Sequence, residues 1–240
     1  MPRARTVLLG AGYAALAVAD SVAAHRGTTT ARRLRLVLKP ALMPVLAAAF
    51  LDGTRGDPRP VPTDLLRAGT VAAQALSWGG DLALLGSSRR SFLAGVGSFA
   101  GAHVAYAAAF LSVRGSPRGG GRIRDTAGLR VALGLWVSAA PLLSVAAGRR
   151  DPALRVPVAA YATVLSGMFA TSRLVDPTRP PVPRRTLQAG TALFLVSDTV
   201  LAVQQFVLTE PRPLLESVVM LTYTAGQGLI AAGVAGLTAC

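Results

Sequence analysis

The sequence contains few of the residues that a metal protein or a soluble enzyme needs. It has one cysteine, Cys240, which excludes a disulfide within the chain and a cysteine metal cluster. Its two histidines, His25 and His103, are too few for a three-histidine zinc site. Charged residues make up only 15% of the chain, whereas an ordinary soluble domain has about 25%. We therefore expect no bound metal and no cofactor, and the low charge argues against a soluble protein.

Apolar residues and arginines are abundant instead. Hydrophobic residues make up 52% of the chain, and the mean hydropathy is +0.48. The 25 Lys and Arg residues outnumber the 11 Asp and Glu residues, which gives a net charge of +14. Disordered tails are poor in apolar residues, and a nucleic-acid binder would mix its basic residues with polar ones, so we expect no nucleic-acid partner. The composition indicates a membrane protein whose arginines face lipid headgroups and solvent.

Eight apolar segments, each close to the ~20 residues that cross the hydrocarbon of a bilayer, fill most of the chain. The connections between them are rich in Pro, Gly and Arg, as expected outside the membrane. The segments lack the alternation of barrel strands, so they predict an all-α membrane protein, an eight-transmembrane-helix bundle in one domain over residues 1–240. The predicted spans are roughly residues 6–24, 34–51, 65–86, 91–113, 127–147, 153–173, 186–208 and 214–238.

An even number of spans places both termini on one side of the membrane. That side carries 14 of the 25 basic residues, and the other side carries 11, including Lys39. Cytoplasmic loops are enriched in basic residues, so this bias, although small, places both termini in the cytoplasm. The chain is predicted to be an integral, multi-pass protein of a bacterial cell membrane.

Polar residues inside the predicted spans form helical stripes. Ionisable groups at membrane depth are costly, and they usually face a cavity or a partner. Residues spaced three, four or seven apart share one face of a helix, so four such stripes predict a polar chamber among the third, fourth, seventh and eighth spans. Asp81 and Lys39 lie toward the side opposite the termini, and the chamber is expected to extend that way. The stripes are Gln74, Ser77 and Asp81; Phe99, His103, Tyr106 and Phe110; Thr191, Asp198 and Gln205; and Glu216, Met220, Tyr223 and Gln227.

The spacing of two of these stripes indicates an internal repeat. Asp81 and Tyr106 are 25 residues apart, and so are Asp198 and Tyr223. A repeat would give two parallel four-helix halves, each contributing one Asp and one Tyr to a central site. The sequences around the two aspartates match only in outline, so a bundle without a repeat stays open.

Other residues have simpler interpretations. Gly97 and Gly101, four residues apart, predict a close contact between helices. Asp20, near the end of the first span, is interpreted as a cap at the membrane interface. Glu216, in the first turn of the last span, suits the positive end of the helix dipole.

Five segments of the chain resemble the YhhN family of membrane proteins, a lysoplasmalogenase-like group. They occur in the family's order and lie in the second, third, fourth, seventh and eighth spans, whereas the other three spans match only as apolar helices. The segments are KPALMPVLAAAF (39–50), LSWGGDLALL (76–85), FAGAHVAYAAAF (99–110), GTALFLVSDTVLAVQQF (190–206) and VVMLTYTAGQGLI (218–230).

The resemblance implies an enzyme, a membrane-embedded ether hydrolase. Its substrate would be a lysoplasmalogen or a related lyso-ether phospholipid, cleaved at the vinyl ether bond to a fatty aldehyde and a glycerophospho-alcohol. This hydrolysis begins with a proton transfer to carbon, which two carboxyls in a low-dielectric site are suited to perform. Asp81 and Asp198 are the predicted catalytic pair, and their roles as acid and base stay open because a coupled pair titrates jointly. The residues expected to bind substrate or water are Lys39, His103, Tyr106, Ser197, Tyr223 and Gln227.

Two alternatives stay open. Asp81 also fits a purely structural ion pair with Lys39, because the two residues lie at the same depth. The protein also fits a small transporter, or a lipid-binding membrane protein, whose intramembrane acids carry protons. Alternating access would require polar residues on both sides of the membrane midplane, and their bias to one side favours an enzyme. The expected partners are the lyso-ether phospholipid and the bilayer, and the sequence does not indicate an oligomeric state.

Overall fold

The computed structural model describes residues 4–56, 60–115, 125–210 and 212–239, and this part of the chain is helical, with one isolated bridge between Arg114 and Val175 instead of a sheet. Eight α-helices coincide with the eight predicted spans, which confirms the all-α bundle. They are α1 (Ala4–Arg26), α2 (Thr29–Gly53), α3 (Val61–Ala83), α4 (Arg89–Ser112), α5 (Thr126–Arg150), α6 (Arg155–Ser172), α7 (Pro181–Phe206) and α8 (Pro213–Thr238), with a short 3-10 helix, η2 (Pro152–Leu154), before α6.

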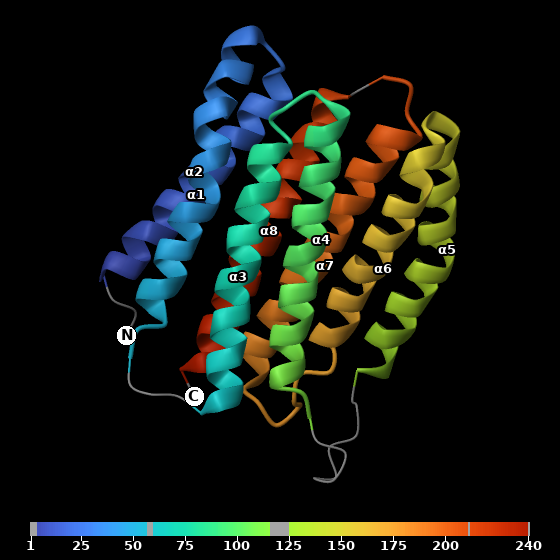
Figure 1. Cartoon of the computed structure of the whole chain (residues 1–240). Coiled ribbons are helices and arrows are strands. Elements are labelled where there is room, and N and C mark those ends of the chain that lie inside the picture. The colour runs from blue at the N-terminus through green and yellow to red at the C-terminus, as the bar shows by residue number, and fades with distance from the viewer. Residues whose placement is uncertain (1–3, 57–59, 116–124, 211, 240) are drawn as a thin grey trace.

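Seven of these helices are long and apolar enough to cross a membrane, which supports an integral multi-pass protein. The exception is α3, which is as long as α1 but less apolar. Its polar residues Gln74, Ser77 and Asp81 are buried inside the bundle. Because α3 runs beside the other helices in Figure 1, we treat it as the eighth span.

The helices run alternately up and down, and consecutive helices pair as hairpins: α1 with α2, α3 with α4, α5 with α6, and α7 with α8. Both termini lie at the lower end of the bundle in Figure 1. We call the opposite end, where α1 joins α2, α3 joins α4, α5 joins α6 and α7 joins α8, the far end. α8 is the most buried of the seven apolar spans, and it contacts α1, α2 and α3 in addition to α7.

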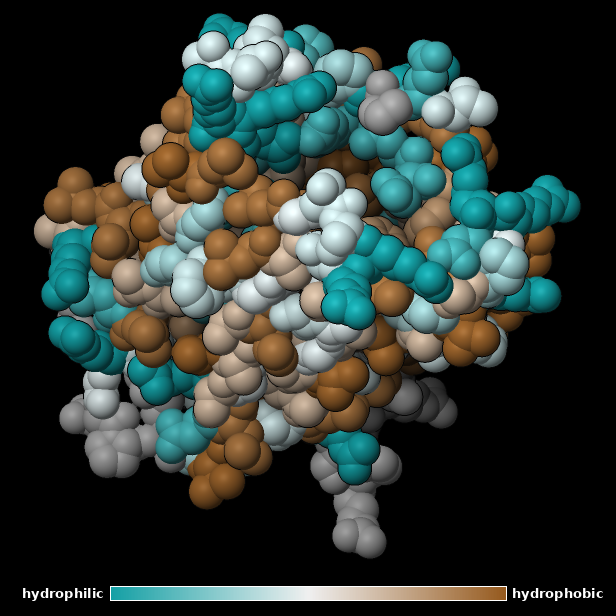
Figure 2. Space-filling view, turned by 45° about the horizontal axis from the view of Figure 1, so that its top comes forward, coloured by the Kyte–Doolittle hydropathy of each residue, from teal (hydrophilic) through white to brown (hydrophobic). Residues whose placement is uncertain are grey.

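The outer surface of the bundle is suited to lipid. Large apolar side chains are exposed on several helices, for example Leu8 on α1, Leu142 on α5 and Leu221 on α8. Figure 2 shows hydrophobic side chains over much of the visible side of the molecule, with many hydrophilic ones toward the top of the view and smaller groups at its left and lower edges. Apolar side chains on the outside cost nothing when the surrounding solvent is hydrocarbon.

Helices α7 and α8 approach each other closely where Gly190 and Gly226 face each other. A Cβ atom added to Gly190 would lie 2.7 Å from the carbonyl oxygen of Gly226, and one added to Gly226 would lie 3.0 Å from the carbonyl oxygen of Gly190. The helix contact predicted for Gly97 and Gly101 is present only at Gly101, where a Cβ atom would lie 3.4 Å from the Leu76 side chain of α3; at Gly97 a Cβ atom would meet nothing within 4 Å, so that half of the prediction is wrong. Glycine spacing alone did not reveal which helix face has a partner.

Two prolines lie inside α2: Pro40, which directly follows Lys39, and Pro44. Proline has no N–H, so Pro44 cannot bond the carbonyl of Pro40, four residues earlier. The indole Nε1 of Trp78, on α3, donates a hydrogen bond of 2.9 Å to this carbonyl instead. This bond ties the turn of α2 that follows Lys39 to the turn of α3 that precedes Asp81.

Candidate functional site

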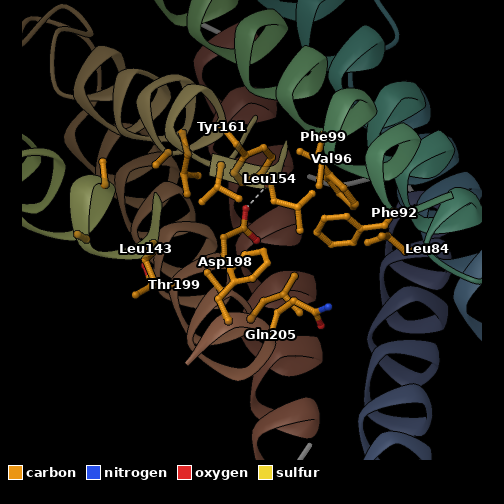
Figure 3. Close-up of a pocket in the computed structure, with 18 of the residues that line it drawn as sticks. Leu84, Phe92, Val96, Phe99, Leu143, Leu154, Tyr161, Asp198, Thr199 and Gln205 are labelled. Atoms are coloured by element: carbon orange, nitrogen blue, oxygen red, sulfur yellow. Dashed lines mark hydrogen bonds between the residues drawn. The ribbon is translucent and has the colours of Figure 1, made fainter. Parts of the chain in front are cut away.

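A cavity of about 600 Å³ lies between α4, α5, α6 and α7 (Figure 3). It extends to the far end, where the connection between α3 and α4 and the first turn of α8 border it. The sequence correctly predicted an opening opposite the termini. The predicted walls are partly wrong, because α5 and α6 supply much of the lining. The apolar lining includes Phe92, Val96, Phe99, Leu143, Leu154 and Leu165, and the ionisable lining residues are Lys39, Arg89, Tyr161, Asp198 and Glu216.

Asp198, on α7, is the aspartate on the wall of this cavity. Its Oδ2 atom accepts a hydrogen bond from the hydroxyl of Tyr161, on α6, drawn as the dashed line in Figure 3. The Nε2 atom of His103, on α4, lies 3.0 Å from the Tyr161 hydroxyl and 3.5 Å from the same Oδ2 atom. The Asp198 side chain is 10% exposed, whereas that of His103 is fully buried. Three helices therefore converge on one oxygen of one carboxyl at the cavity wall.

Asp81, on α3, has a different environment. Its Oδ2 atom accepts a hydrogen bond of 2.8 Å from the hydroxyl of Tyr223, and its Oδ1 atom lies 3.5 Å from Nζ of Lys39. Its side chain is only 2% exposed, and Asp81 is not among the described residues that line the cavity. Lys39 does line it. The ion pair that the sequence left open as an alternative is thus present, with the lysine toward the cavity and the carboxylate behind it.

The remaining predicted site residues bond to one another or to the backbone. The hydroxyl of Tyr106 donates to Oε1 of Gln227 at 2.6 Å, and Nε2 of Gln227 donates to the hydroxyl of Ser77 at 2.9 Å. The hydroxyl of Ser197 donates to the carbonyl of Val219, on α8, at 3.0 Å. Ser77, Tyr106 and Gln227, from α3, α4 and α8, thus bond to one another and form a buried polar core beside the cavity.

Of the eight predicted site residues, the structure thus places Asp198 and Lys39 on the cavity wall. His103 and Tyr223 each contact one of the two aspartates and lie behind the wall. Tyr106, Ser197 and Gln227 belong to the buried core. Contact of these five residues with substrate stays a prediction.

Tyr161 is the site residue that the sequence reasoning missed. It is a tyrosine in the sixth span, which matched the family only as an apolar helix, and no other polar residue extends it into a stripe. The signal available was the residue type itself, since a tyrosine at membrane mid-depth needs a partner for its hydroxyl. The partner, Asp198, lies on another helix.

Arg35, on α2, links two acids that the sequence analysis treated separately. Its Nε atom lies 3.3 Å from Oδ1 of Asp20, and its Nη1 atom donates to Glu216. Asp20 is fully buried, so its interpretation as an interfacial cap is wrong. Together with the adjacent pair of Lys39 and Asp81, these residues form a charged network beside the mouth of the cavity.

The two aspartates do not have equivalent partners. A symmetric repeat would pair each aspartate with a tyrosine in the same relative position. Asp81 instead bonds Tyr223 from the second half, and Asp198 bonds Tyr161 from its own half. An internal repeat of the backbone stays a prediction. The hydrogen bonds of the two aspartates do not have the symmetry that a repeat would give them.

The fold and the cavity define a multi-pass helical membrane protein with an internal amphipathic site. Residues 34–234 match the YhhN family, and the chain belongs to this family. The matched segment contains every candidate site residue, from Lys39 to Gln227. Searches of curated proteins and of solved structures gave no match.

Proposed function

We propose that this protein is a membrane-embedded hydrolase that cleaves the vinyl ether bond of a lysoplasmalogen or a related lyso-ether phospholipid. The observation that carries the proposal is a carboxyl, Asp198, on the wall of a mainly apolar cavity that also presents Lys39. The volume of about 600 Å³ lies within the range of roughly 300–1,000 Å³ that is typical of ligand pockets.

The shape and polarity of the cavity suit a lipid with one chain. The apolar side chains of α4, α5 and α6 would surround the hydrocarbon. Lys39 would face the phosphate, because a lysine supplies a compact positive charge with three donors. The mouth lies at the far end, where the ligand would enter from one leaflet.

The chemistry requires a proton donor that can reach carbon. Asp198 would transfer its proton to the β-carbon of the vinyl group, where the electron pair of the double bond forms the new C–H bond. The positive charge left on the ether-bearing carbon is shared with its oxygen and steadied by the Asp198 carboxylate. Water then adds to this carbon and returns a proton to the carboxylate. The resulting hemiacetal then collapses. Its hydroxyl loses a proton, the bond between the carbon and the glycerol oxygen breaks, and this oxygen takes up a proton, which gives an aldehyde and an alcohol.

Asp81 was predicted as the second carboxyl of this reaction, and that role stays a prediction. Asp81 lies behind Lys39, where its ion pair would also hold this lysine in place at the cavity wall. A transporter is less consistent with the arrangement, since the ionisable groups at the cavity lie toward the far end of the bundle.

The experiment is a comparison of three lyso-phospholipids with the same headgroup and chain length, offered to the purified protein in detergent. They carry a vinyl ether, a saturated alkyl ether or an ester at the first glycerol carbon. Only the vinyl ether forms a stabilised cation on protonation, so only this lipid should release aldehyde. Folded wild-type protein that releases no aldehyde from the vinyl ether, or that cleaves the ester equally well, would reject the proposal.

A further inference from the structure

The two oxygens of the Asp198 carboxyl have different environments. Oδ2 accepts a hydrogen bond from Tyr161 and lies 3.5 Å from Nε2 of His103. Oδ1 accepts no hydrogen bond from the described residues, and the side chain borders the cavity. One oxygen is thus held by the protein, and the other is available to a ligand.

Counting protons fixes the roles of the two neighbours. The single hydroxyl proton of Tyr161 is donated to Asp198, so the Tyr161 oxygen can only accept from Nε2 of His103, 3.0 Å away. His103 must therefore carry a proton on Nε2. Its Nδ1 atom is buried and has no hydrogen-bond partner in the described part of the chain. A bare Nδ1 avoids leaving an N–H donor unpaired, and the neutral ring with its proton on Nε2 is the form that fits.

The ring of His103 cannot rotate freely into another arrangement. Its centroid lies 4.8 Å from that of Phe194 and 5.3 Å from that of Tyr161, both in edge-on contacts. The residue is fully buried on α4 and does not border the cavity. Packing therefore keeps Nε2 directed at Tyr161 and Asp198.

We propose that Tyr161 and His103 are positioning residues that act in sequence: His103 donates to the Tyr161 oxygen, and Tyr161 donates to Oδ2 of Asp198, so that Oδ1 alone gives the catalytic proton and takes it back. The reaction itself rests on the proposed function, and Asp198 serves as acid in its first step and as base in its second. One carboxyl is sufficient, because the proton lost to carbon is regained from water. Asp81 then acts only through Lys39.

Activity of variants tests this assignment. Tyr161→Phe removes one hydroxyl and should lower kcat about 100-fold while KM changes by less than about threefold, because Asp198 loses its orientation and not its place. Tyr13→Phe is the matched control, since its buried hydroxyl donates to the carbonyl of Thr224 on the other side of the bundle; it should retain kcat. Equal kcat values for the two variants would overturn the role of Tyr161.

Two substitutions at His103 separate a donor from a proton carrier. Gln offers an amide N–H at about the position of Nε2, whereas Met offers none. His103→Gln should keep most of the kcat that His103→Met loses. If both variants lose the same activity, His103 carries the proton itself and the proposal is wrong.

A double variant tests whether one carboxyl is enough. Asp81→Asn combined with Lys39→Met removes both charges of the buried pair, so neither is left uncompensated. Its KM should rise, because Lys39 faces the cavity, but its kcat should stay within about tenfold of wild type, whereas Asp198→Asn should lose roughly 1,000-fold. A double variant that is folded and as slow as Asp198→Asn would restore the two-carboxyl mechanism.

The closing experiment does not depend on hydrolysis. In a His25→Gln background, His103 is the only histidine, and ¹⁵N-histidine labelling reports its two ring nitrogens by NMR in detergent. We expect a protonated Nε2 and a bare Nδ1, with the Nε2 signal shifting in Asp198→Asn and in Tyr161→Phe but not in Tyr13→Phe. A proton on Nδ1 in the neutral ring would overturn the inference, even in an active enzyme. The expected spectrum in a protein inert toward vinyl ethers would preserve the arrangement and reject the proposed function.

Discussion

At the scale of single residues, accessibility separates two aspartates that look equivalent in the sequence. Both lie in predicted spans, and both accept a hydrogen bond from a tyrosine. Asp198 borders the cavity, whereas Asp81 is enclosed by Lys39 and Tyr223. The oxygens of the buried Asp81 carboxyl are occupied by Lys39 and Tyr223, whereas a carboxyl at a cavity wall can meet a ligand. Reactivity at this site therefore depends on which oxygen atoms the protein leaves free.

The charged network beside the cavity makes a prediction about stability. Arg35→Met would leave the fully buried carboxylate of Asp20 without its partner. Removing one member of a buried ion pair costs about 3–5 kcal/mol, and the free energy of unfolding, measured by denaturant titration in mixed micelles, should fall by that amount. Arg33→Met is the matched control: Arg33 is exposed on the same helix, and its loss should cost less than about 0.5 kcal/mol.

A second substitution provides the check on this interpretation. Asp20→Asn in the Arg35→Met background removes the uncompensated charge and should recover most of the lost stability. If the double variant is no more stable than Arg35→Met alone, the arginine acts through packing and not through its charge.

At the scale of helices, α2 and α3 are joined by a hydrogen bond that exists because of a proline. Trp78→Phe removes the donor to the Pro40 carbonyl, at a position that faces lipid where no water replaces it. An unsatisfied carbonyl costs about 1–3 kcal/mol, and the midpoint of thermal unfolding should fall accordingly. In a Pro44→Ala background the N–H of residue 44 is restored, so Trp78→Phe should then cost less than about 0.5 kcal/mol. Equal costs in both backgrounds would show that the indole contributes only by packing.

The sequence predicted the helices better than it predicted their contacts. All eight predicted segments are helices, and seven of them are long and apolar enough to cross a membrane, because length and hydropathy are properties of one segment at a time. Most residues of the polar stripes on α3, α4 and α8 are buried as expected, but several of them bond to each other, as Tyr106 and Gln227 do. Tyr161 was missed and Gly97 was misassigned for the same reason: both depend on which neighbouring helix a face meets. Which face of one helix packs against which neighbour is a property of two helices, and periodicity within one helix does not reveal it.

At the scale of the whole molecule, the orientation in the membrane decides from which leaflet a lipid reaches the cavity. Both termini lie at one end of the bundle and the cavity reaches the other. If the termini are cytoplasmic, as the distribution of basic residues predicts, the mouth faces the opposite leaflet. The substrate would then come from the outer side of the membrane.

Cysteine labelling tests this orientation directly. Cys240 is the only native cysteine, so a Cys240→Ser background carries none. Glu210→Cys lies in the exposed connection between α7 and α8 at the far end, and Thr178→Cys lies in the exposed connection between α6 and α7 near the termini. A membrane-impermeant thiol reagent should label the first variant in intact cells and the second only after permeabilisation. The reverse pattern would place the termini outside.

The most direct measurement of the central claim is hydrolysis of a vinyl ether lyso-phospholipid in D₂O, with mass spectrometry of the aldehyde. Proton transfer from Asp198 to the β-carbon predicts one deuterium on the carbon next to the aldehyde group with wild-type protein. We expect Asp198→Asn to be folded and to release roughly 1,000-fold less of this labelled aldehyde. Folded wild-type protein that forms no aldehyde, or an Asp198→Asn variant that forms the labelled aldehyde at the wild-type rate, would contradict the account.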